Sequence, residues 1–303
     1  STQGYSSAAS DVYKRQSYNS KKYIKKAIDS VLEQTYSNFE LIIVDGNSTD
    51  GTLDILDEYK KQDRRIKVIQ DEGRGIGAAL QLGCQIASGK FIARMDSDDI
   101  AINTRFEKQL KIFHSIPNLI LVASPVIYIN EDDSIVGYSF PYTNKRIIQE
   151  KVYLIAHPTV MMKKDAYVKA GGYQPLLRAE DYFLWNRMRL MGEFYIFKEP
   201  LIKYRLLQDS LSHTLDDNFN KKLGRKLESY FIKPIISEID IIEINDFIST
   251  NLPKNRIISH MSSKRKIRLF SFLKIIFKFL PLNIFVVKFV ISIKNVFGFL
   301  YVK

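Results

Sequence analysis

The stretch "FIARMDSDDI", from Phe91 to Ile100, joins an apolar run directly to three closely spaced carboxylates. Its first four residues suit a buried strand, and Asp96, Asp98 and Asp99 follow at once. Carboxylates crowded at the end of a strand repel one another, and a cation between them removes that repulsion. Mg²⁺ and Mn²⁺ prefer oxygen ligands and often bridge carboxylates to substrate phosphates. The stretch therefore predicts a divalent cation site, although a solvated acidic turn would give the same triplet.

Apolar runs and helical patterns alternate around this stretch. Strands are predicted at residues 38–45, 66–69, 90–95 and 119–129. This alternation predicts an α/β fold whose mostly parallel sheet is covered by helices on both faces. Ligands bind beyond the carboxyl ends of the strands in such sheets. Asp45 and the Asp96 cluster both lie at carboxyl ends, so they are expected to face one cleft.

Composition excludes several classes of protein. The 303 residues include one cysteine, Cys84, and four scattered histidines. A disulfide framework and a cysteine-rich zinc site are excluded, and the histidines do not suggest a histidine-based metal site. Gly75 and Gly77 superficially suggest a dinucleotide loop, but the third glycine of G-x-G-x-x-G is missing.

The net charge of +12 is concentrated near the C-terminus. Eleven Lys or Arg and no acid follow Asp246, which leaves residues 1–246 with 34 bases and 33 acids. Lysines interrupt the apolar stretches of residues 264–303, so no charge-free run is long enough for a transmembrane helix. We expect a helix lying on an anionic membrane surface, the alternative being a helix pair docked on the rest of the chain. Nucleic acid is disfavoured as a partner because large aliphatic residues separate the lysines and arginines of this segment.

Five motifs in a fixed order resemble those of family-2 inverting glycosyltransferases, which have the GT-A fold. They are "YNS" at 18–20, "LIIVDGNSTDGT" at 41–52, "GKFIARMDSDD" at 89–99, "HPTVMMKKDAYVKAGGY" at 157–173 and "AEDYFLW" at 179–185. The resemblance covers about residues 17–213, and it is greatest to bacterial enzymes of capsule, O-antigen and exopolysaccharide synthesis.

The resemblance implies roles for residues on the donor side of the site. Tyr18 stands where the family stacks an aromatic ring near the nucleotide base, and Asp45 matches the acid that hydrogen-bonds that base, usually uracil. Asp96 and Asp98 match the DXD motif and are the candidate ligands of Mn²⁺ or Mg²⁺ on the donor diphosphate, with Asp96 also near the ribose. Arg74 lies where a basic residue can approach the donor. The alternative for Asp45 is that it caps the following turn.

The resemblance also implies roles on the acceptor side. Asp181 matches the general base that takes the proton of the acceptor hydroxyl. Glu180 and Trp185 beside it are candidate substrate-binding residues. The alternatives are an acidic first helical turn for the two acids and a core position for the tryptophan. His157 is interpreted as a structural or cleft-lining residue.

Two departures from the family pattern affect these expectations. The polar string "SSAASDVYKRQS" at residues 6–17 replaces the usual apolar first strand, so residues 1–16 are predicted to be non-native and the central strand to be lacking. Leu207 occupies a position where many relatives have histidine. The Gln-x-x-Arg-Trp motif of processive synthases is absent, which favours transfer of a single sugar.

The sequence therefore predicts a GT-A domain at residues 17–215 and a helical, membrane-associating region at 216–303. The expected activity is metal-dependent, inverting transfer from a UDP-sugar to a glycan or lipid-linked acceptor, at the cytoplasmic face of the membrane. The alternatives are a catalytically dead nucleotide-sugar-binding module and a metal-dependent nucleotidyltransferase.

Overall fold

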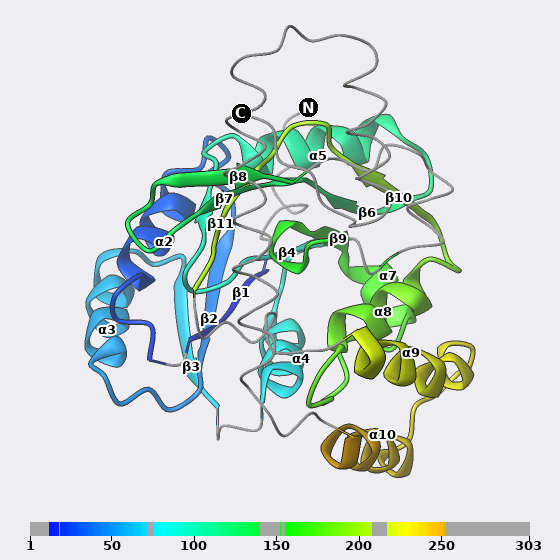
Figure 1. Ribbon diagram of the computed structural model, residues 1–303. Coiled ribbons are helices and arrows are strands. Elements are labelled where there is room, and N and C mark those ends of the chain that lie inside the picture. The colour runs from blue at the N-terminus through cyan, green and yellow to red at the C-terminus, as the bar shows by residue number, and fades with distance from the viewer. Residues whose placement is uncertain are drawn as a thin grey trace, which may run out of the picture.

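A seven-stranded sheet forms the centre of the molecule (Figure 1). The computed structural model describes residues 12–17, 19–71, 75–139, 152, 155–207 and 217–251. In spatial order the strands are β10 (Glu193–Ile196), β6 (Leu119–Ala123), β9 (Met161–Lys163), β4 (Phe91–Arg94), β1 (Val12–Ser17), β2 (Glu40–Asp45) and β3 (Ile66–Gln70). All neighbours are parallel except β9, which runs antiparallel to β4 and β6. The mostly parallel sheet predicted from the sequence is confirmed.

The order of the strands determines where a ligand can bind. The chain proceeds from β1 outward to β2 and β3, and then returns to place β4 on the other side of β1. Such a reversal opens a crevice beyond the carboxyl ends of the two strands that flank it. The turn that begins with Asp96 follows β4, so it lies at the carboxyl end of β4, where this topology places ligands.

Helices cover both faces of the sheet, as predicted. They are α2 (Ile24–Leu32), α3 (Thr52–Gln62), α4 (Ile76–Ile86), α5 (Arg105–Ser115), α7 (Lys164–Lys169) and α8 (Glu180–Met188), with a short 3₁₀ helix η2 (His157–Thr159). Successive residues of β2 alternate between two cores. Leu41 and Ile43 pack with α2, α3 and α5, whereas Ile42 and Val44 pack with α4, α7 and α8.

A second, four-stranded sheet contains β5 (Ile100–Ala101), β11 (Ile202–Arg205), β7 (Val126–Ile129) and β8 (Ile135–Tyr138), in that order. The prediction of a single strand at residues 119–129 is therefore wrong. The run divides at Ser124 and Pro125 into β6 and β7, which belong to different sheets. Proline cannot donate a ladder hydrogen bond, so it ends one strand and lets the chain change sheets.

The N-terminal segment forms the central strand that the sequence appeared to lack. Backbone pairing places Val12–Ser17 parallel to β2 along its full length and to β4 at residues 12–14. The expectation of a lacking strand is thus wrong for these six residues. Backbone N–H and C=O groups make the ladder whatever side chains they bear, and their neighbours in the sheet need partners. The non-native origin of residues 1–16 stays a prediction.

Two further helices follow: α9 (Asp217–Phe231) packs on α8, and α10 (Glu238–Asn251) packs on α9. Phe183 of α8 joins Leu223, Leu227 and Ile244 in a third apolar cluster. The buried Arg187 donates hydrogen bonds to the carbonyl oxygens that follow α9, among others. The division near residue 215 and the membrane-associating tail stay predictions, and residues 252–303 lie outside the described residues. No helix in the described ranges is long and apolar enough to span a bilayer.

Candidate active site

Asp45, at the end of β2, is fully buried and holds the turn that follows it. Its Oδ1 accepts a hydrogen bond from the backbone N–H of Ser48 at 2.8 Å, and its Oδ2 accepts one from the Ser48 hydroxyl at 2.7 Å. The same hydroxyl oxygen accepts the backbone N–H of Asn19 at 2.9 Å, which ties this turn to the segment after β1. The Asp45 carboxylate therefore caps the turn that follows it, as the alternative interpretation predicts. Contact between Asp45 and a nucleotide base stays a prediction.

The acidic turn after β4 is held by partners from distant parts of the chain. The Asp96 carboxylate pairs with the guanidinium of Arg94, the last residue of β4. The Ser97 hydroxyl lies 2.7 Å from that of Ser20, which follows β1. Arg94 is 4% exposed, so this pair lies against the protein interior. The geometry joins the ends of β1 and β4 at the crevice.

Arg205, at the end of β11, holds the second half of the turn. Its backbone N–H donates to Asp99 Oδ1 at 2.9 Å, and its Nε donates to the carbonyl oxygen of Asp98 at 2.8 Å. Asp99 is only 1% exposed, and within the described residues its Oδ2 has no hydrogen-bond partner. Burial and the negative charges of Asp98 and Asp96 raise the pKa of Asp99 well above its usual range.

These observations fit a divalent cation beside the turn. Carboxylate oxygens are the ligands that Mg²⁺ and Mn²⁺ prefer, and a cation would offset the repulsion among three neighbouring acids. Arg94 already neutralises Asp96, so Asp98 is the stronger candidate ligand of the two predicted. Its side chain is partly exposed.

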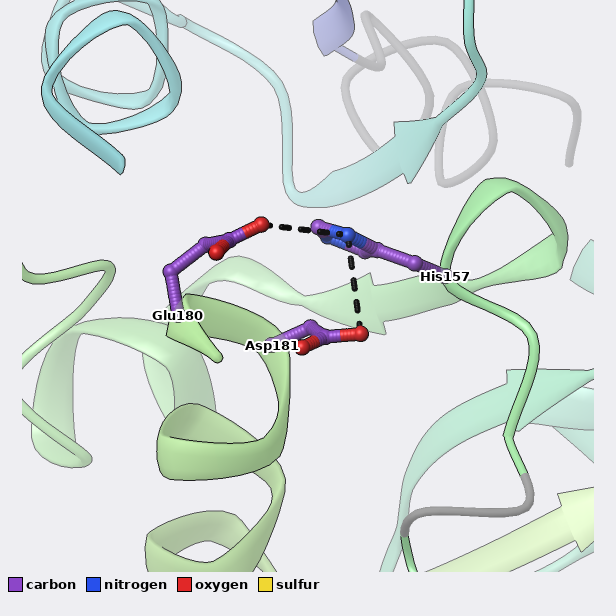
Figure 2. Close-up of side chains that lie close together, drawn as sticks. All are labelled: His157, Glu180 and Asp181. Atoms are coloured by element: carbon purple, nitrogen blue, oxygen red, sulfur yellow. Dashed lines mark ion pairs between the residues drawn. The ribbon is translucent and has the colours of Figure 1, made fainter. Parts of the chain in front are cut away.

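A second group of titratable side chains is formed by His157, Glu180 and Asp181 (Figure 2). Nδ1 of His157, on η2, lies 3.7 Å from Glu180 Oε1 and 3.8 Å from Asp181 Oδ2, at the start of α8. The opposite ring nitrogen, Nε2, lies 2.8 Å from the hydroxyl of Tyr173. The imidazole also meets the edge of Trp185, with ring centroids 5.7 Å apart.

Electrostatic interactions connect these three side chains to the acidic turn after β4, called the DXD turn below because it contains Asp96 and Asp98. Burial raises the pKa of Glu180 to about 8, and the charge of Asp181 adds to the shift. Burial also raises the pKa of Asp181, whose side chain keeps 31% of its surface exposed. The negative charge of Asp96 raises both values and the positive charge of Arg94 lowers both. The two acidic groups therefore influence each other electrostatically.

Trp185, a predicted substrate-binding residue, does not line this site. Trp185 is 0% exposed and packs in the core with Tyr173 and Leu184, so the core alternative holds and an acceptor cannot stack on its ring. Tyr18 and Arg74 lie outside the described residues.

Sequence reasoning missed two members of the site, because Arg94 reads as part of a strand and Tyr173 as part of a double-glycine turn. His157 is interpreted as a structural or cleft-lining residue, without its contacts to the two acids. The only signal was position, because Arg94 lies in the motif that contains Asp96 and Asp98, and His157 and Tyr173 stand at the two ends of the motif at 157–173. No pattern in the sequence shows that residues 157 and 181 meet.

With this geometry established, comparison with known proteins identifies the family. Residues 16–170 match the family described as Glycosyl transferase family 2. The chain is 34% identical over 220 residues to an uncharacterized glycosyltransferase of Methanocaldococcus jannaschii, covering 69% of this chain and 73% of the relative. It is 35% identical over 194 residues to an O-antigen biosynthesis glycosyltransferase, WbnJ, of Escherichia coli, covering 61% and 75%. The chain belongs to glycosyltransferase family 2.

Solved structures establish the fold as GT-A. S. aureus TarS in complex with UDP-GlcNAc superposes with a TM-score of 0.59 at 17% identity, over 85% of this chain and 80% of that one. A mannosyltransferase from Pyrobaculum calidifontis, in complex with GDP-Man and Mn²⁺, gives a TM-score of 0.55 at 15% identity, over 85% and 74%. At these identities the similarity concerns the fold alone.

Proposed function

We propose that this glycosyltransferase moves one sugar from a UDP-sugar, with inversion, to a glycan or lipid-linked acceptor in surface polysaccharide synthesis. The observation that supports this best is the position of Asp181. Its carboxylate is partly exposed, has a raised pKa, and lies within the electrostatic influence of the DXD turn. A base in this place can take a proton while a donor is held next to it.

On the acceptor side, Asp181 is the general base. Inverting transfer requires removal of the hydroxyl proton as the acceptor oxygen attacks the anomeric carbon. A raised pKa makes the carboxylate a stronger proton acceptor near neutral pH. The raised pKa of Glu180 keeps that neighbour largely protonated below about pH 8, so the two acids differ in charge although they are adjacent.

On the donor side, Asp98 is the proposed ligand of Mn²⁺ or Mg²⁺. When bound, such an ion supplies Lewis-acid stabilisation to the departing nucleoside diphosphate. Asp45, Asp96 and, from the unplaced segments, Tyr18 and Arg74 are proposed to contact the nucleotide. The UDP-GlcNAc bound to TarS supports a UDP-sugar donor, and the GDP-Man of the archaeal enzyme defines the main alternative.

A donor screen tests this function. The full chain is incubated with UDP- and GDP-sugars, Mn²⁺ and a glycan acceptor, and nucleoside diphosphate release is measured together with the anomeric configuration of the product. We expect UDP release and an inverted product. Asp181→Asn should lower transfer about 10²–10⁴-fold, since the amide cannot accept the proton, and should leave donor affinity unchanged.

Other outcomes would assign the chain to another class of protein. Release of pyrophosphate would identify a nucleotidyltransferase, and donor binding without transfer would identify a binding module. An equal loss of donor affinity in Asp181→Asn would mean that this residue contacts the donor instead.

We also propose that the enzyme is peripheral on the cytoplasmic face of the membrane. Support comes from the eleven bases and no acids after Asp246 and from the relative named for O-antigen biosynthesis. Anionic lipids attract such a segment, and its interleaved apolar residues can enter the interface.

A further inference from the structure

We propose that His157, Glu180 and Asp181 bind a transition-metal ion of the zinc type, and that this ion inhibits transfer. The metal site is separate from the oxygen-only site at Asp98. Its inhibitory effect rests on the proposed function, since it requires Asp181 to be the base.

The spacing between His157 and each of the two carboxylates fits a small tetrahedral ion. Their ligand atoms all lie within 4.8 Å of one another. With bonds of about 2.0–2.2 Å, two ligands of a tetrahedral zinc ion lie about 3.3–3.6 Å apart. The nitrogen of His157 is 3.7 Å and 3.8 Å from the two carboxylate oxygens, so movements of a few tenths of an ångström bring these pairs into place.

The orientation of the imidazole is set by its surroundings. Tyr173 is fully buried, and its hydroxyl lies 2.8 Å from Nε2 of His157. Ligating histidines usually engage their second ring nitrogen in this manner, which fixes the ring and directs the other nitrogen toward the metal. The edge contact with Trp185 restricts the ring further. Nδ1 therefore faces the carboxylates, as Figure 2 shows.

The ligand types separate this site from the DXD turn. Imidazole nitrogen together with carboxylate suits Zn²⁺ or Co²⁺, whereas an oxygen-only set suits Mg²⁺ and Mn²⁺. A dication between the two carboxylates would also offset the negative charge that they carry once both are ionised. An ion held by Asp181 occupies the lone pair that would accept the acceptor proton, so metal binding and base catalysis exclude each other.

Direct binding tests the site without donor or acceptor. Zn²⁺ is titrated by calorimetry into the full chain with excess Mg²⁺ present, and Co²⁺ is used as a visible-absorption probe of the geometry. We expect one Zn²⁺ whose affinity depends on His157, and a Co²⁺ spectrum typical of four ligands. His157→Ala should lower Zn²⁺ affinity by about 100-fold or more, and Tyr173→Phe by about 10-fold or more.

Two further variants control for nonspecific binding of Zn²⁺ and for misfolding of His157→Ala. His114→Ala, at the exposed end of α5, should leave Zn²⁺ affinity unchanged. Tyr173→Phe keeps the buried ring and removes only its hydroxyl, so it tests the site even if His157→Ala fails to fold. Failure of the wild-type chain to bind Zn²⁺, or equal binding by folded His157→Ala or Tyr173→Phe, would overturn the proposal.

An activity measurement separates this proposal from the proposed function. With Mn²⁺ constant, Zn²⁺ should inhibit transfer over the concentration range in which it binds. Zn²⁺ binding in a chain that transfers no sugar would refute the function and leave the site intact. Transfer that is insensitive to bound Zn²⁺ would show that the ion does not occupy the base.

Discussion

Replacing Glu180 by glutamine should stabilise the protein at neutral pH. Its side chain is 8% exposed, and burial with the charge of Asp181 raises its pKa from 4.5 to about 8. At pH 7 the folded protein therefore keeps this carboxyl protonated, whereas the unfolded chain ionises it. Glutamine has the shape of the protonated acid and does not titrate, so Glu180→Gln removes the cost of keeping a proton in the folded state.

The size and sign of the effect follow from proton linkage. Between about pH 4.5 and 8 the folded state binds more protons at this group than the unfolded state does. The contribution of Glu180 to the free energy of unfolding is thus fully present below pH 4.5 and is lost as the pH rises toward 8. Each pH unit in this range costs about 1.4 kcal/mol. Wild type and Glu180→Gln should be similar near pH 4.5, and the variant should be about 3 kcal/mol more stable at pH 7.

Urea unfolding at several pH values between 5 and 8, without divalent ions, measures this difference. Far-UV circular dichroism reports the transition, and equal m-values in both proteins validate the comparison. Glu33→Gln, at an exposed position after α2, is the matched control for the loss of a carboxylate outside the site. A difference that does not grow with pH, or a less stable Glu180→Gln at pH 7, would show that Glu180 is ionised and stabilised by His157.

Three further predictions concern the metal, the membrane and the N-terminus. Asp98→Asn should lower transfer about 100-fold or more and weaken metal-dependent UDP binding, because a ligand charge is lost; unchanged activity, beside an Asp132→Asn control, would remove this assignment. The intact chain should bind anionic vesicles in a partly salt-sensitive manner, and truncation near Asn251 should remove that binding but keep transfer to a soluble acceptor. Absence of vesicle sedimentation at every salt concentration would exclude the membrane surface. Replacing residues 1–16 with an apolar "VSVIIPV"-type strand should raise the melting temperature by about 2–4 °C per kcal/mol gained, and a lower value would indicate a native N-terminus.

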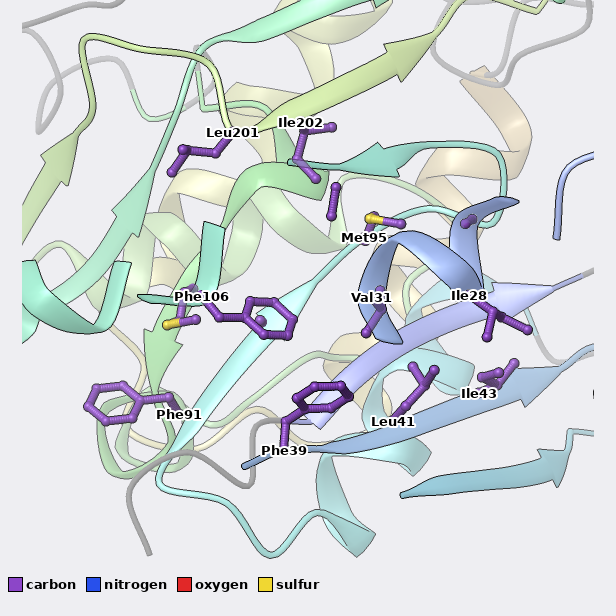
Figure 3. Packing of buried hydrophobic residues seen from close by; sticks show 14 of the residues in the cluster. Ile28, Val31, Phe39, Leu41, Ile43, Phe91, Met95, Phe106, Leu201 and Ile202 are labelled. Atoms are coloured by element: carbon purple, nitrogen blue, oxygen red, sulfur yellow. The ribbon is translucent and has the colours of Figure 1, made fainter. Parts of the chain in front are cut away.

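Local pattern alone determined much of this fold. The apolar run that ends in Asp45 and the run before Asp96 both form strands, and the helical patterns between such runs form helices, among them α2, α3 and α5. Their apolar faces meet in one core, where Ile28, Leu41 and Phe106 lie among the labelled side chains (Figure 3). Periodicity is a property of neighbouring residues, so it can be read without knowing the topology.

Tertiary structure alone decided how the strands are ordered. Four of the six residues 12–17 are polar, which contradicts the pattern of a central strand, yet backbone pairing with β2 and β4 places the segment there. The apolar run at 119–129 satisfies the strand pattern, yet it divides between two sheets at Pro125. For residues 12–17 the partner strands determine the outcome, whereas at 119–129 Pro125 ends the first strand and the tertiary structure decides which sheet each half joins.

The same limit applies to the site. The sequence identified Asp98 and Asp181 as candidate residues because each stands in a motif. The pairing of Arg94 with Asp96, the meeting of His157 with Glu180 and the burial of Trp185 could not be derived in that way. His157 meets Glu180, and Trp185 is buried, because antiparallel β9 lies between β4 and β6. This position of β9 brings η2, the segment before it, to the start of α8. Motifs show which chemical groups are present, whereas their distances depend on strand order and on packing between residues far apart in the chain.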